Sequence, residues 1–253
     1  MLTQVMCSAE GSPPSSLSVS PDTRPGSLST AGTGLFLDIG AMTTPTYSIR
    51  PAAPDDVPKI LGLIGSSAAW LQEKKQTDQW ARPWPNRDER DARVVQGIAD
   101  RLTFMVEDSA GAVIGTVTCR EHGNDMLWTE AELAEPAAYV SRLIVSRDHA
   151  GQGIGAALID WAGARAVDSW GANWVRVDVW TTNDALHQYY KDQGFGHMRT
   201  LEFADPWQYP SAALFQKPAA TISREAAGWF REASLAPGLN QLRGRRPPRG
   251  QRP

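Results

Sequence analysis

The chain has 253 residues, a formal net charge of −3 and 42% hydrophobic residues, and this composition is that of an ordinary globular protein with one good core. The charge excludes a strongly basic nucleic-acid-binding protein, and no apolar run is long enough to span a membrane. Two cysteines, Cys7 and Cys119, exclude a disulfide framework or a cysteine metal site and favour a reducing, cytoplasmic location.

The N-terminal segment is rich in Ser, Pro and Gly and contains "GSPPSSLSVSPDTRPGSLSTAGTG". Such a segment buries too little apolar surface to offset its ordering entropy, so we expect residues 1–43 to be disordered. The segment has neither a basic leader nor an apolar block, and we expect no secretory signal. Met42 directly precedes sequence with regular patterning, and we hypothesise that it is the natural start.

One α/β domain is predicted over residues 44–218. "TYSIRPA" alternates like a strand, and two amphipathic helices follow, the first starting near Asp55 and the second within "RDERDARVVQGIADRL". "TFMVEDSAGAVIGTVTC" predicts an antiparallel hairpin. The remaining elements are an acidic loop at 120–137, a strand at 139–145, a helix at about 154–169, a strand at 174–180, a helix at 184–193 and β runs near 197–203 and 211–217. The predicted sheet is mixed, antiparallel at first and then with a β-α-β crossover.

The region 219–253 divides into an apolar part and a basic part. Its first half places apolar side chains on one face of a predicted helix: Ile222, Ala226, Trp229, Phe230 and Ala233. We expect this face to dock on the domain. The tail "RGRRPPRGQRP" is expected to be a disordered, solvated end, with a weak anion or nucleic-acid contact as the alternative.

A glycine-rich loop stands between the predicted strand at 139–145 and the helix that follows. Glycines in such a loop let the backbone approach a phosphate group. Gly151, Gly153 and Ala156 satisfy the dinucleotide pattern G-x-G-x-x-G/A, and Asp178 on the next strand could bind a ribose. Against this interpretation, five residues intervene between Val145 and the first glycine, and too little chain follows for a doubly wound sheet. A nucleoside-triphosphate loop is excluded because no Gly-Lys-Ser/Thr follows.

The run "SRLIVSRDHAGQGIGAALI" resembles the acyl-CoA signature of the GNAT N-acetyltransferase superfamily. In that family a strand leads into Arg/Gln-x-x-Gly-x-Gly/Ala and then into a helix. Gly153 and Gly155 fill the two glycine positions, and Ala150 departs from the usual Arg or Gln. The departure is tolerable because backbone N–H groups and the helix N-terminus do most of the pyrophosphate binding.

The resemblance extends downstream through "VDVWTTNDALHQYYKDQGF". Asn183 matches the family's asparagine, Tyr190 the tyrosine seven residues later, and Gly194-Phe195 the closing pair. The resemblance therefore covers roughly residues 44–218. It implies an α/β fold of the GNAT type, in which a mixed sheet has antiparallel N-terminal strands and a β-α-β acyl-CoA-binding core.

The resemblance also implies an activity, namely acetyl-CoA-dependent transfer of an acetyl group to a primary amine, with no metal. By position, the residues expected to bind acetyl-CoA are Leu143, Ile144, Val145, Gly151, Gln152, Gly153, Ile154, Gly155, Ala156 and Asn183. The strand residues among them would pair with the pantetheine arm, and the N–H of Leu143 or Ile144 could face the thioester oxygen. Asn183 could equally cap the following helix.

Tyr190 matches the tyrosine that protonates the CoA sulfur, and its ordinary pKa of about 10 suits a general acid. A packing role for Tyr190, with Tyr189 as the acid, is the alternative. We expect Asp178 to be the general base, because some family members carry an acid at this spacing. The alternatives are an ion pair of Asp178 with an arginine, or another base among Glu130, Glu132, Glu135, His122 and His187.

The acceptor side is predicted between the first two helices, in "WLQEKKQTDQWARPWP". Trp80 and Trp84, with Asp78, Gln79 and Glu130, would suit a small amine with an apolar or aromatic body. The sequence leaves an antibiotic, a polyamine, an amino acid and a protein N-terminus open as acceptors, and it leaves a homodimer open. The alternative functions are a non-catalytic acyl-CoA sensor or interaction module and, less favoured, a nucleotide-dependent oxidoreductase. No membrane or nucleic-acid partner is expected.

Overall fold

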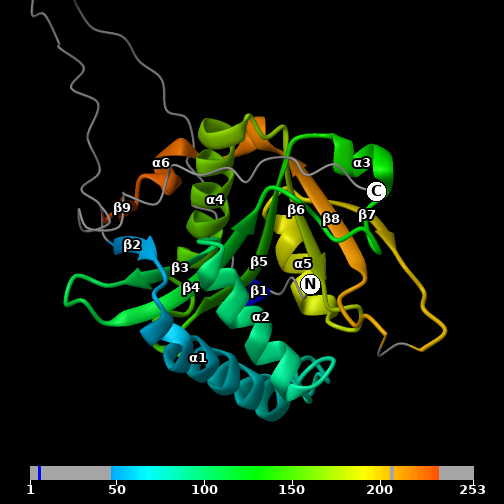
Figure 1. The fold of residues 1–253 in the computed structure, drawn as a ribbon, viewed down its shortest axis with the longest axis horizontal. Coiled ribbons are helices and arrows are strands. Elements are labelled where there is room, and N and C mark those ends of the chain that lie inside the picture. Colours follow the sequence, from blue (N-terminus) through cyan, green and yellow to red (C-terminus); the bar gives the residue numbers. More distant parts are fainter. Residues whose placement is uncertain (1–4, 7–46, 206–207, 234–253) are drawn as a thin grey trace, which may run out of the picture.

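The computed structural model describes residues 5–6, 47–205 and 208–233, and its strands form a mixed sheet (Figure 1). The strand order is β7-β8-β6-β5-β4-β3-β2-β9, and β1 pairs with β5 off this path. The strands are β1 (Val5–Met6), β2 (Tyr47–Pro51), β3 (Thr103–Glu107), β4 (Val113–Arg120), β5 (Ala137–Val145), β6 (Trp174–Val179), β7 (Gly196–Thr200), β8 (Ala213–Pro218) and β9 (Phe230–Glu232). The predicted mixed sheet with a β5-α4-β6 crossover is confirmed.

Helices cover both faces of this sheet (Figure 1). They are α1 (Val57–Trp70), α2 (Arg87–Ala99), α3 (Glu130–Ala134), α4 (Ile154–Trp170), α5 (Asp184–Asp192) and α6 (Arg224–Ala227). Apolar residues of α4 and α5 share one core cluster with the sheet, and those of α1 and α2 share another. The helices α1 and α2 therefore pack on a different part of the core from the crossover helix α4.

The two faces of the central strands differ in polarity. In β6, Val175, Val177 and Val179 belong to the core under α4 and α5. Arg176 and Asp178 alternate with them, are buried, and point to the α1 and α2 face. Buried polar residues of the neighbouring strands follow the same alternation: Thr116, Thr118 and Arg120 on β4 and Ser141 on β5. A polar surface therefore lies beneath α1 and α2, in the middle of the sheet.

The strands β5 and β6 pair only over their first three residues, from Ala137 to Tyr139 of β5. Farther along, β5 remains paired with β4 but has no partner in β6. A bulge lies in this unpaired half, since Thr118 faces Ser141 and Thr116 faces Ile144, so that two residues of β5 stand opposite one residue of β4. On this side of β5, at the end that leads into the glycine loop, the described part of the chain offers only the two-residue strand β1 as a partner.

The C-terminal prediction requires a correction. The expected helix with one apolar face over residues 222–233 is only the single turn α6, and Phe230–Glu232 is a strand that pairs in parallel with β2. Gly228 follows the helix, and the free edge of β2 offers the next residues hydrogen-bond partners. The sheet thus extends past residue 218. The predicted acidic loop also contains a helix, α3, started by a Thr129–Glu132 capping box.

Most of the predicted N-terminal extension and the arginine-rich tail lie outside the described residues, so those predictions stay predictions. In the part of the chain that is described, no helix is both long and apolar enough to cross a membrane. The same part contains no cluster of three or more His, Cys, Asp or Glu residues placed to hold a metal ion.

Candidate active site

The glycine loop prepares the N-terminus of α4. Gly151 and Gly153 have φ values of 76° and 75°, in the left-handed region that glycine adopts without strain. Gly153 is the N-cap residue of α4, so the N–H groups of Ile154, Gly155 and Ala156 have no partners within the helix. Gly151, Gln152 and Gly153 are exposed. The loop therefore presents backbone donors and the positive end of a helix dipole to solvent, as a pyrophosphate requires.

The edge of β5 that β6 has left leads directly to this loop. Leu143 and Ile144 are fully buried, and their second backbone edge is the one that β6 has left. The short strand β1 pairs in parallel with this edge, opposite Leu143 and Ile144. The edge predicted to bind pantetheine can therefore accept an extended backbone-like partner.

Tyr190 lies on α5 with no exposed surface. Its ring contacts Phe195 at 5.2 Å and Phe215 at 6.0 Å between centroids, and it belongs to the same core cluster as Leu143 and Ile154. This packing fixes the ring, and it does not by itself decide between a catalytic and a packing role.

Asn183 caps α5, since its side chain accepts a hydrogen bond of 3.0 Å from the N–H of Leu186. Its amide also donates to Gln79, and Asp78 accepts a 2.9 Å hydrogen bond from the indole of Trp180. Two of the predicted acceptor residues thus fasten the α1–α2 connection to the end of β6. The capping role of Asn183 is observed, and its contact with CoA stays a prediction.

Asp178 is 4% exposed and accepts a 3.2 Å hydrogen bond from the hydroxyl of Tyr209. Burial, followed by the charge of Asp178, raises the pKa of Tyr209 well above 10, so that this hydroxyl stays protonated and keeps donating. Arg176, on the same face of β6, pairs instead with Glu135 on the edge of α3. The carboxylate of Asp178 is thereby held on the polar face beneath α1 and α2.

The other candidate bases either bind neighbouring residues of the fold or are exposed to solvent. Arg199 donates to Glu132 at 2.7 Å and lowers the pKa of Glu132 to about 2, which makes this carboxylate a poor base. The ring of His187 bonds the carbonyl of Trp180 at 2.9 Å, and Glu130 and His122 are exposed. Burial raises the pKa of Cys119 to about 12, so this thiol is no nucleophile at neutral pH.

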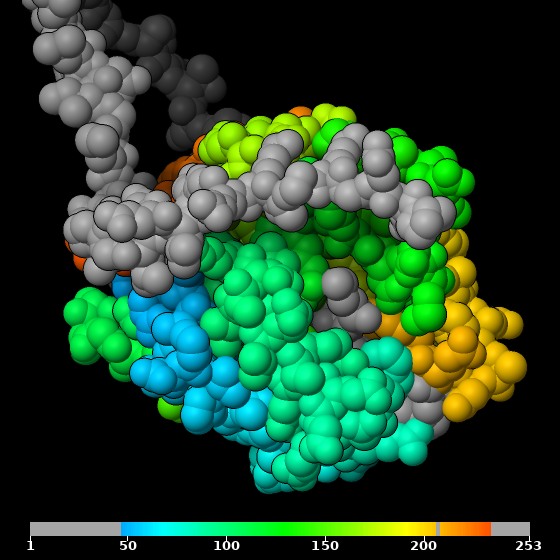
Figure 2. All heavy atoms as spheres, in the orientation of Figure 1, coloured from blue at the N-terminus to red at the C-terminus, as the bar shows by residue number. Residues whose placement is uncertain are grey.

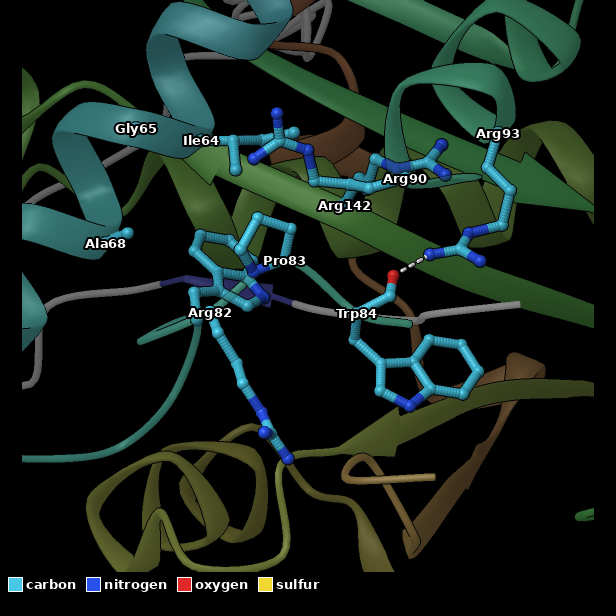
Figure 3. Close-up of a pocket in the computed structure, with 10 residues that line it drawn as sticks. Ile64, Gly65, Ala68, Arg82, Pro83, Trp84, Arg90, Arg93 and Arg142 are labelled. Carbon is cyan, nitrogen blue, oxygen red and sulfur yellow. Dashed lines mark hydrogen bonds between the residues drawn. The ribbon is translucent and has the colours of Figure 1, made fainter. Parts of the chain in front are cut away.

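A pocket opens between α1, the α1–α2 connection, α2 and β5. It is lined by Ile64, Gly65, Ala68, Trp80, Arg82, Pro83, Trp84, Arg90, Arg93 and Arg142 (Figure 3). In Figure 2, α1 and α2, drawn in blue to teal, cover part of the face shown. Of the predicted acceptor residues, Trp80 and Trp84 line the pocket, whereas Asp78 lines a neighbouring one together with Tyr209 and Trp180.

Sequence reasoning missed Tyr209 and the arginines of this pocket. Tyr209 contacts Trp84 at 5.0 Å between ring centroids and reaches Asp178, although it lies between two β runs with no pattern of its own. Arg142 interrupts the apolar run "YVSRLIV", and a charged residue within a buried strand was the sequence feature that could have indicated a functional role for it.

Comparisons with known proteins agree with this geometry. The model of the acetyltransferase (GNAT) family matches residues 68–195. The uncharacterized N-acetyltransferase YesJ of Bacillus subtilis (strain 168) is 28% identical over 151 residues, which are 58% of this chain and 81% of that protein.

Two solved structures of GNAT-family acetyltransferases share the fold. The one from Listeria monocytogenes 4b F2365 has 26% identity and a TM-score of 0.55, covering 68% of this chain and 94% of that chain. The one from Streptococcus agalactiae 2603 has 16% identity and a TM-score of 0.51, covering 68% and 95%. The chain belongs to the GNAT family of acetyltransferases and is an N-acetyltransferase.

Proposed function

We propose that this chain transfers the acetyl group of acetyl-CoA to the primary amine of a small molecule, by direct attack through a tetrahedral intermediate. The observation that carries the proposal is the course of β5. The strand leaves β6 after Tyr139, has only the two-residue strand β1 beside Leu143 and Ile144 in the described part of the chain, and leads into the glycine loop at the N-terminus of α4. One continuous segment thus offers an edge for pantetheine and donors for pyrophosphate.

Different residues of β5 and the glycine loop would bind different parts of acetyl-CoA. The N–H groups of Gln152 through Ala156, with Gly151 and Gly153 permitting the turn, would hold the pyrophosphate. Leu143, Ile144 and Val145 would pair with the pantetheine amides, and an N–H of Leu143 or Ile144 would stabilise the oxyanion. Acetyl-CoA supplies the activated acyl group, and the protein orients it.

Two proton transfers complete the reaction. The amine must lose a proton, for which we assign Asp178, held by Tyr209 on the polar face of β6. The departing thiolate must gain one, for which we assign Tyr190. With Cys119 buried and protonated, attack by the amine on the thioester itself is the simpler route than an acetylated enzyme.

An assay of thiol release from acetyl-CoA over a panel of amines tests this proposal. We expect turnover that depends on the amine, together with acetyl-CoA binding in calorimetry and no binding of NAD. Binding of acetyl-CoA without turnover on any amine would favour a non-catalytic acyl-CoA sensor over an enzyme. Binding of NAD alone would favour the oxidoreductase.

Replacing Asp178 by asparagine is expected to lower the rate most at low pH, where more of the amine is protonated and needs a base. The loss should fall within the roughly 10²–10⁴-fold range of general acid–base catalysis, with acetyl-CoA affinity nearly unchanged. The pH profile of kcat/KM is the measurement. Asp160→Asn is the matched control, because Asp160 pairs with Lys217 at 2.9 Å on the α4 side. A wild-type profile for Asp178→Asn would contradict its role as the base.

A chain that starts at Met42 is expected to bind acetyl-CoA about three- to tenfold more tightly than the full chain. The reason is that β1 pairs with the same edge of Leu143 and Ile144 that pantetheine needs, so only molecules with β1 displaced can bind. Titration calorimetry on both chains measures the difference. Equal affinities would contradict competition for this edge. N-terminal mass spectrometry of the natively expressed protein tests separately whether translation starts at Met42.

A further inference from the structure

Three arginines from separate elements meet beside the acceptor pocket. Arg93 comes from α2, Arg120 from the end of β4 and Arg142 from the bulge of β5. Arg120 is 9% exposed and Arg142 6% exposed. The guanidinium groups of Arg120 and Arg142 lie beside Gly97, because a Cβ built on Gly97 would lie 3.5 Å from Nη1 of Arg142 and 3.7 Å from Nη2 of Arg120. Arg93 is close enough to act on Arg142 through its charge.

These buried charges are not matched within the described part of the chain. Neither the side chain of Arg120 nor that of Arg142 makes a hydrogen bond or an ion pair to a described residue. Nη1 of Arg142 and Nε of Arg93 are buried without a hydrogen-bond partner. Arg93 donates to the carbonyl of Trp84. By contrast, Arg176 is equally buried and is bound by Glu135, Tyr139 and Gln216.

Of the acidic groups that face the cluster, only Asp178 is buried. Asp178 and Asp100 act on Arg120 through space, and Glu89 acts on Arg93, but Asp100 and Glu89 are exposed. Burial, with the neighbouring Arg120 and Arg93, lowers the pKa of Arg142 to about 9, so its guanidinium is still charged at neutral pH. An uncompensated buried charge of this kind is destabilising unless a ligand pairs with it.

The backbone of Arg142 is also strained. It has a φ of 44°, which a side chain other than glycine rarely adopts, and it sits in the bulge that turns its side chain out of the strand's alternation. Figure 3 shows the side chain directed toward Ile64 of α1, with Arg90 and Arg93 entering from α2 and Trp84 opposite. Strain and unpaired charge thus coincide at one residue of the pocket wall.

We propose that the acceptor is an amine that also carries a carboxylate, such as an apolar or aromatic amino acid, and that Arg142, with Arg93 and Arg120, binds this carboxylate. This inference rests on the proposed function, because it assumes that the pocket receives the acceptor. A carboxylate accepts two parallel hydrogen bonds from a guanidinium, and the surrounding low dielectric strengthens the pairing. Trp80 and Trp84 offer apolar walls for the rest of the molecule.

The test compares amines that differ only in the carboxylate: L-tryptophan with tryptamine, and L-phenylalanine with phenethylamine. We expect kcat/KM of the wild type to be higher for the amino acid in at least one pair. Arg142→Met should lower kcat/KM for that amino acid by about 10²-fold and change it little for the amine without the carboxylate. Arg224→Met is the control, because Arg224 pairs with Asp168 on the exposed side of α6 and should leave both rates unchanged.

Thermal unfolding gives a readout that needs no activity. Arg142→Met removes an unpaired buried charge and should raise the Tm, and the N-acetylated amino acid should stabilise the wild type but not this variant. Equal stabilisation of the wild type and of Arg142→Met by the N-acetylated amino acid would overturn the proposal. If that variant unfolds, Arg93→Met is used for the same comparison of substrates.

The remaining outcomes separate the two proposals. Turnover of the decarboxylated amines with no preference for amino acids would overturn the carboxylate site and leave the acetyltransferase standing. Failure of every amine would instead count against the proposed function. The final experiment compares succinyl-CoA with acetyl-CoA as the acyl donor. If Arg142 binds a carboxylate of the acyl group, succinyl-CoA will be the preferred donor, and this result would overturn assignment of the site to the acceptor.

Discussion

Gly153→Asp is expected to weaken acetyl-CoA binding by about 10²-fold or more while the protein stays folded. Gly153 caps α4 with a φ of 75°, and a carboxylate at this position would stand among the N–H groups that the pyrophosphate needs. Like charges brought together in a binding site cost several kcal/mol, and each 1.4 kcal/mol is about tenfold in affinity. Titration calorimetry with acetyl-CoA measures the change.

The opposite end of the same helix supplies the control. Gly171 follows α4 with a φ of 70°, and no atom lies within 4 Å of a Cβ built there. Gly171→Asp therefore introduces the same residue into the same backbone conformation, far from the loop. We expect this control to lose stability through strain and to keep its acetyl-CoA affinity. An unchanged dissociation constant for Gly153→Asp would exclude the loop as the pyrophosphate site.

Tyr190→Phe is expected to lower kcat by roughly 10²–10⁴-fold, the usual contribution of general acid catalysis. The change removes only the hydroxyl, and the ring contacts with Phe195 and Phe215 remain. The KM for acetyl-CoA and the Tm should therefore change little. Steady-state kinetics and thermal unfolding of the same preparations give all three quantities.

Tyr189→Phe is the matched comparison, because Tyr189 lies beside Tyr190, with ring centroids 5.5 Å apart. It is expected to keep most of the activity. Full activity of Tyr190→Phe would leave that residue a packing role. If Tyr189→Phe loses activity instead, the proton comes from Tyr189.

Most of the fold follows from patterns within single segments. The helices α1, α2, α4 and α5 were predictable because their apolar spacing and caps are local, and α4 begins at Ile154 as its glycine loop indicates. The strand β9 was not predictable, because three residues carry no period and form a strand only where β2 offers an edge. The bulge in β5 was hidden for a similar reason, since it depends on the register against β4.

The candidate site divides in the same way. The glycine loop, Asn183 and Tyr190 follow each other at the spacing of the family, so they could be proposed from the sequence, and their roles in catalysis and CoA binding stay predictions. Arg93 and Arg120 could not, because each resembles a surface arginine in its own segment and only the packing of α2 on the sheet brings them together. Tyr209 was hidden likewise, because only the fold places it against Asp178.

Transfer of a labelled acetyl group from acetyl-CoA to an amine is the most direct test of the proposed acetyltransferase activity. Acetyl-CoA with a deuterated acetyl group is incubated with the protein and an amine that supports thiol release, and the products are analysed by mass spectrometry. We expect the label on the nitrogen of the amine, and we expect Tyr190→Phe to form this product far more slowly than the wild type. Label found only in free acetate, or acetyl-CoA bound with no amine labelled, would contradict the proposed activity.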